Sequence, residues 1–139
     1  MAQRRVLVID DEPRVLDIVR YFLEQGGYQV EAFTGRDEGL AAARGAPFDV
    51  AALDIVLEGT SGYDVAFGLR KIKNTERVPV LFMSSKVEMA DLFLQSYDGR
   101  AEFILKPFKK AELLEKIELL AGGGGRQAHK APPPSRKAN

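Results

Sequence analysis

The chain lacks three features that would direct its chemistry elsewhere: cysteine, a long apolar run, and a histidine in its body. It has no cysteine among 139 residues, which excludes disulfides, thiolate metal sites and cysteine nucleophiles. No apolar run approaches a membrane span or the layout of a signal peptide. The only histidine, His129, lies near the C-terminus, so the preceding body has no His-based general base or phosphohistidine. We therefore expect a soluble, cytoplasmic protein that does not contact membranes.

Acidic residues are missing from the last part of the chain. All 20 Asp and Glu residues precede Gly122, whereas four of the 20 Lys and Arg residues follow it. Residues 1–121 therefore carry a net charge of −4 and residues 122–139 carry +4. The second segment is rich in Gly and Pro and has no apolar pattern, so we predict a flexible basic tail or linker. The acidic body argues against nucleic-acid binding by the folded domain.

Short apolar segments predict the strands of a buried sheet. Four runs, each bounded by polar or turn residues, have the pattern of strands buried in a parallel sheet. A fifth segment, 28–33, nearly alternates apolar with polar residues, so we expect it at a sheet edge. The four runs are 6–9, 50–53, 78–83 and 103–105.

Helical patterns lie between these runs. The strongest covers 13–25, with a proline near its start and two glycines after its end, as helix boundaries prefer. The alternation predicts one α/β domain over residues 1–121, with helices on both faces of a parallel sheet and no attached output domain. The other four expected helices cover 36–44, 62–73, 87–96 and 110–120.

Polar residues follow four of the expected strands at matching places. Asp10 and Asp11 follow the first strand, and Asp54 ends the third. Ser84 follows the fourth strand and Lys106 the fifth. Because the carboxyl ends of parallel strands face one crevice, where ligands bind, we expect these side chains to converge.

A converged set of this kind has a definite chemistry. Three carboxylates repel one another unless a hard cation with oxygen ligands neutralises them, and Mg²⁺ is the expected ion. The ammonium of Lys106 and the hydroxyl of Ser84 could then stabilise a phosphoryl group. Asp54, central among the strands, is the best candidate for a carboxylate nucleophile that forms an acyl phosphate.

Each residue alone also has an ordinary structural interpretation. Asp11 could cap the following helix, Asp54 could be a turn residue, Ser84 a loop hydroxyl and Lys106 a solvated charge. Their joint occurrence at four strand ends of one topology favours a functional site.

Four segments closely resemble the motifs of response-regulator receiver domains of bacterial two-component systems, the CheY-like superfamily. The resemblance extends from residue 4 to about residue 121, with the motifs in the family's order. It implies a flavodoxin-like, doubly wound fold with a five-stranded parallel sheet in the order 2-1-3-4-5 and five helices. It also implies a phosphoryl-accepting signalling switch, not an enzyme. The segments are 6–13, 53–55, 79–84 and 103–108.

The resemblance implies roles for individual residues. Asp54 corresponds to the phosphoacceptor, and Asp10 and Asp11 to the acidic pair that binds Mg²⁺ with Asp54 and the backbone carbonyl of Val56. Lys106 corresponds to the phosphate-binding lysine, and its bond to Pro107 to a site where the family has a cis peptide.

The resemblance further implies a switch and partners. Ser84 corresponds to the switch hydroxyl and Phe103 to the switch aromatic. A histidine kinase or phosphotransfer protein would supply the phosphoryl group. A downstream effector would read the face made by the fourth helix, the last strand and the last helix. The protein would be a monomer or a phosphorylation-dependent dimer.

The chain departs from the family pattern at three places. Glu58 stands where the loop after the phosphoacceptor usually has a proline, which would loosen the loop and adds a negative charge. Ser85 replaces a common alanine, and residues 95–102 differ from the usual pattern. None of these departures removes a chemical group from the expected site.

Two other functions are compatible with the topology. The departures at Glu58 and near the fourth helix motivate a receiver-like interaction module that is not phosphorylated. A flavin or nucleotide binder is the other alternative. Such proteins usually meet phosphate with glycine- or hydroxyl-rich turns, whereas the acidic residues 10–12 would repel it without a metal.

Overall fold

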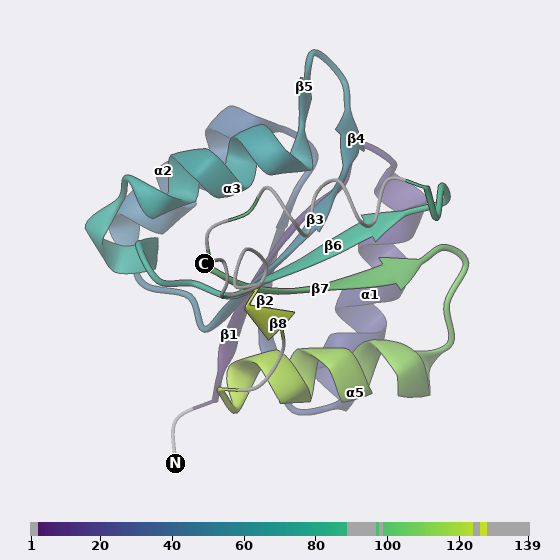
Figure 1. Cartoon of the computed structure of the whole chain (residues 1–139). Helices are drawn as coiled ribbons and strands as arrows, with labels where there is room; N and C mark the ends of the chain where they lie inside the picture. The colour runs from purple at the N-terminus through teal and green to yellow at the C-terminus, as the bar shows by residue number, and fades with distance from the viewer. Residues whose placement is uncertain (1–2, 89–96, 98, 124–125, 128–139) are drawn as a thin grey trace, which may run out of the picture.

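The computed structural model describes residues 3–88, 97, 99–123 and 126–127. Its main sheet has five parallel strands in the expected order, which is β2-β1-β3-β6-β7 in the labels of Figure 1. The expected placement of the second strand at a sheet edge is confirmed. The strands are β1 (Arg5–Ile9), β2 (Gln29–Phe33), β3 (Val50–Asp54), β6 (Val80–Ser84) and β7 (Arg100–Leu105).

Helices cover both faces of this sheet, as expected. Helices α2 and α3 lie on one face, and α1 and α5 lie on the other (Figure 1). Each face buries its own apolar cluster, because successive side chains of β1 and β3 point to opposite sides of the sheet. The helices are α1 (Pro13–Gln25), α2 (Arg36–Gly45), α3 (Gly62–Arg70) and α5 (Lys110–Ala121), with a 3-10 turn, η1 (Lys73–Thr75). The helix expected over 87–96 falls almost entirely outside the described residues.

Several boundaries differ from the expected ones. Helix α3 ends at Arg70 and not at residue 73, because the Leu69 carbonyl accepts from the Ile72 amide at 3.1 Å and the Thr75 hydroxyl at 2.7 Å. Strand β6 begins at Val80, two residues late. Strand β7 begins at Arg100, three residues early, because Ala101 and Glu102 pair with β6 and Arg100 pairs with the later strand at 126–127.

A short hairpin follows β3 that the apolar pattern did not predict. Strand β4 (Val56–Leu57) pairs antiparallel with β5 (Thr60–Ser61). Gly59, at the two-residue turn, has a φ of 76°, a conformation that glycine adopts without strain. Glu58 occupies the other turn position, and its amide is hydrogen-bonded.

The sheet also gains a sixth strand. Strand β8 (Arg126–Gln127) pairs antiparallel with the first two residues of β7. It belongs to the segment 122–139, for which we expected a flexible tail or linker. The observed pairing is limited to two residues on each strand.

Candidate functional site

Three carboxylates meet at the carboxyl ends of β1 and β3. One oxygen from each of Asp10, Asp11 and Asp54 lies within 4.8 Å of the other two. Asp10 is fully buried and Asp54 is 6% exposed, whereas Asp11 is the more exposed member. The topology thus brings together residues that are 44 positions apart in the chain.

Backbone amides fix the orientation of each carboxylate. The Glu12 amide donates to Asp10 Oδ1 at 3.0 Å, and the Val56 amide donates to Asp54 Oδ1 at 3.3 Å. Each of these contacts spans two residues. Asp11 is held differently, because its Oδ2 accepts from the Glu58 amide at 3.1 Å, across 47 residues.

Lys106, just after β7, reaches into this acidic group. Its Nζ atom lies 2.6 Å from Asp10 Oδ2 and 3.4 Å from Asp54 Oδ2. Its own amide donates to the Ser84 carbonyl at 2.8 Å, which ties the ends of β6 and β7 together. The Lys106–Pro107 bond is cis, as the resemblance implied.

Ser84 ends β6 beside the same cavity. Its side chain is buried, and Oγ accepts from the Lys86 amide at 3.0 Å. The hydroxyl proton therefore remains available for another acceptor. Asp11, Asp54, Ser84 and Lys106 all line a cavity of about 660 Å³, and Val56 lines it as well.

The comparisons with known proteins agree with this geometry. The family model described as response regulator receiver domain matches residues 6–118. The chain belongs to the receiver domain family. Receiver domains of response regulators are phosphorylation switches of two-component signalling and not conventional enzymes.

Known relatives match this chain over most of its length. The transcriptional regulatory protein ResD of Bacillus subtilis is 29% identical over 118 residues, which are 85% of this chain and 48% of ResD. Protein PilH of Pseudomonas aeruginosa is 29% identical over 119 residues, 86% of this chain and 98% of PilH. The Thermotoga maritima response regulator TrrA, solved with Mg²⁺-BeF, is 29% identical with a TM-score of 0.73, covering 85% of this chain and 99% of TrrA. The chain thus spans about half the length of ResD and nearly all of PilH.

Charge and burial make the Asp54 carboxyl of this receiver domain unusual. Burial raises the pKa of Asp54 from 3.8 to about 6, and the charge of Asp10 acts in the same direction. Lys106 and the Val56 amide oppose this rise without cancelling it. For Lys106, burial alone would lower the pKa, but the hydrogen bond and charge of Asp10, with Asp54, outweigh it and raise the pKa. Lys106 thus remains a cation, and the site as a whole has excess negative charge.

The structure shows supporting residues that the motifs did not. Gly62 begins α3 directly against the backbone of Asp54, where a Cβ atom would lie 2.4 Å from the Asp54 carbonyl oxygen. The Gly62 amide donates to the Ile55 carbonyl at 2.9 Å. A glycine just before a helical pattern was the available signal, but a close approach of this kind depends on tertiary structure.

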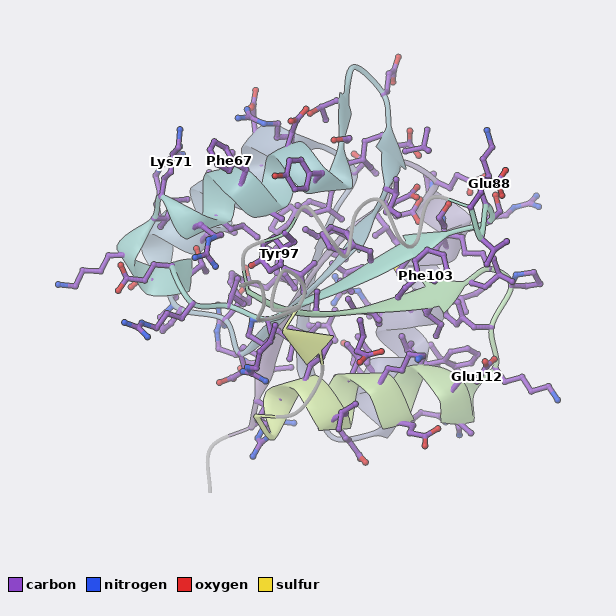
Figure 2. All side chains as sticks on the ribbon, viewed as in Figure 1. Phe67, Lys71, Glu88, Tyr97, Phe103 and Glu112 are labelled. Atoms are coloured by element: carbon purple, nitrogen blue, oxygen red, sulfur yellow. The ribbon has the colours of Figure 1, made fainter. Side chains whose placement is uncertain are left out.

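Phe103 is the expected switch aromatic. It is on β7, partly exposed, and packs against the apolar cluster beneath α2 and α3 (Figure 2). It is absent from the described residues that line the cavity.

The described helices include none that is long and apolar enough to span a membrane.

Proposed function

We propose that this receiver domain accepts a phosphoryl group on Asp54, with Mg²⁺ held by the neighbouring oxygen ligands. The observation that carries the proposal is the meeting of three carboxylates within 4.8 Å, with the partly buried Lys106 between two of them. A histidine kinase or phosphotransfer protein in the bacterial cytoplasm would be the donor.

The donor atoms suit a hard divalent cation. Asp10, Asp11, Asp54 and the Val56 carbonyl would hold Mg²⁺, which binds carboxylate and carbonyl oxygens. Among the described residues, Lys106 is the only cation paired with these three carboxylates, so the site keeps a net negative charge that a dication would neutralise. When bound, Mg²⁺ would neutralise this charge and that of the incoming phosphoryl group. TrrA, solved with Mg²⁺-BeF, is the relative that supports this assignment.

Three side chains of the site would each have a separate role in phosphoryl transfer. An Asp54 oxygen attacks phosphorus, an acyl phosphate forms, and the bond from phosphorus to the donor nitrogen breaks. Lys106, 3.4 Å from Asp54 Oδ2, pairs with a phosphoryl oxygen and gives up part of its contact with Asp10. Ser84 donates its free hydroxyl proton to another phosphoryl oxygen.

The same contacts would operate the switch. Movement of Ser84 toward the phosphoryl group opens space near the end of β7, and Phe103 can rotate inward to fill it. The face expected to include β7, α5 and the helix over 87–96, which lies almost entirely outside the described residues, then changes its packing surface. Glu112 lies in the first turn of α5 and Phe103 lies on β7, the two described elements of this face (Figure 2). We propose that a downstream effector, or a second copy after phosphorylation, reads it.

The non-phosphorylated interaction module is less well supported. That alternative depended on Glu58 and on residues 95–102. The Glu58 amide holds Asp11 at 3.1 Å, so this departure is compatible with a metal site. Residues 95–99 of the second segment precede β7. Some of these positions lie outside the described residues.

Incubation with acetyl phosphate and Mg²⁺, followed by intact-mass spectrometry, tests the proposal. We expect one added phosphoryl group in the wild type and none in Asp54→Ala or in the presence of EDTA. Asp17→Ala, which removes an exposed carboxylate on α1, is the matched control and should react like the wild type. Uptake that survives both Asp54→Ala and EDTA would contradict the proposal.

A further inference from the structure

The tip of the β4–β5 hairpin delivers one backbone amide to the acidic site. Glu58 donates this N–H to Asp11 Oδ2 at 3.1 Å. Asp10 and Asp54 are held by amides only two residues further along their own segments. Asp11 is therefore the one member of the triad that accepts a backbone amide from a distant part of the chain.

The base of the hairpin is firmly attached to the fold. Leu57 is 6% exposed and belongs to the apolar cluster beneath α2 and α3. The Thr60 hydroxyl donates to Asp64 Oδ2 at 3.2 Å, and Ser61 Oγ caps α3 by accepting from the Asp64 amide at 3.1 Å. With both strands fixed in this way, the position of the tip follows α3 and β3.

The hydrogen bond leaves Asp11 suited to bind a cation. The Glu58 amide occupies Oδ2, and Oδ1 has no hydrogen-bond partner among the described residues. Both oxygens of Asp10 and both of Asp54 contact an amide or Lys106. Asp11 Oδ1 is thus the carboxylate oxygen of the triad with the fewest contacts among the described residues. Without the Glu58 amide, the Asp11 carboxylate would rotate freely in solvent.

We propose that the Glu58 amide is a positioning group that holds Asp11 in the metal-binding arrangement and so strengthens Mg²⁺ binding. The proposal rests on the metal site of the proposed function. It assigns the effect to the N–H and not to the carboxylate, because the Glu58 side chain is exposed. Outer-shell donors that orient a ligand typically change metal affinity by tenfold or more when lost.

Isothermal titration with Mg²⁺ alone tests this on the full chain. Glu58→Ala keeps the N–H and removes the carboxylate, so its dissociation constant should stay within about twofold of the wild type. Glu58→Pro removes the N–H and should weaken Mg²⁺ binding about tenfold. Amide NMR signals of Thr60 and Ser61 would show whether the hairpin persists.

A second replacement covers the possibility that proline disrupts the hairpin. Semisynthesis with an ester in place of the residue 58 amide removes the N–H while keeping the side chain, and should also weaken binding about tenfold. Wild-type affinity in the ester protein would overturn the proposal, as would equal weakening in Glu58→Ala. A wild type that binds no Mg²⁺ would instead overturn the proposed function, and this inference with it.

Discussion

Leu53 and Asp54 are neighbours on β3, and both are buried, yet they affect the fold in opposite ways. Leu53 is 0% exposed within the apolar cluster beneath α2 and α3, and Asp54 is 6% exposed at the strand's carboxyl end. Burial of the leucine stabilises the native state. Burial of the carboxylate costs free energy, which the raised pKa of Asp54 reflects. The sheet interior thus supplies the stability that allows the strand ends to concentrate charge for function.

The largest expected loss of stability comes from truncating the buried leucine, Leu53. Leu53→Ala leaves a cavity in the centre of the sheet and should lower the free energy of unfolding by about 3–4 kcal/mol. Leu119→Ala, at a leucine of α5 that is 47% exposed, is the control and should change it by less than about 1 kcal/mol. Urea denaturation measures both, and similar losses would contradict the assigned core.

Removal of the Lys106 side chain should cause the next largest loss of stability. Lys106→Ala leaves the fully buried Asp10 without its 2.6 Å partner and should destabilise the metal-free protein by about 3 kcal/mol. Mg²⁺ should recover part of this loss because it supplies positive charge to the same carboxylates. Lys110→Ala, at an exposed position of α5, is the control. A Lys106→Ala protein as stable as the wild type would show that Lys106 does not compensate Asp10.

Asp54→Asn should stabilise the metal-free protein, in contrast to the change at Leu53. Since the pKa of Asp54 is raised from 3.8 to about 6 in the folded state, its ionised form destabilises the native state. The cost is complete above about pH 6 and absent below about pH 4. Asp54→Asn should therefore add about 3 kcal/mol near pH 8 and almost nothing near pH 3.5. A gain that is independent of pH would contradict this origin.

The smallest effect is expected at the C-terminus. We predict that removal of residues 122–139 changes the free energy of unfolding by less than about 0.5 kcal/mol, because β8 pairs with β7 over only two residues. Removal of residues 128–139 alone keeps β8 and isolates its contribution. A loss of several degrees in the unfolding midpoint for the first deletion only would mean that β8 stabilises the sheet edge.

The contrast between buried apolar strands and charged strand ends also explains which parts of the structure the sequence predicts. The apolar runs around residues 6–9 and 50–53 predict central strands because burial on both faces demands apolar side chains. Their topology then predicts that Asp10, Asp54 and Lys106 converge. The hairpin escapes prediction because each of its strands has only two residues, too few for a periodic pattern. The Glu58–Asp11 bond and the approach of Gly62 to Asp54 depend on tertiary contacts that no local pattern encodes.

The central claim is that Asp54, among three adjacent carboxylates, is the residue that forms the acyl phosphate. Borohydride reduces an aspartyl phosphate to homoserine, so treatment after acetyl phosphate and Mg²⁺ marks the reacted residue permanently. We predict that peptide mass spectrometry finds homoserine at position 54 and aspartate at positions 10 and 11. Homoserine at position 10 or 11, with aspartate intact at 54, would contradict the account.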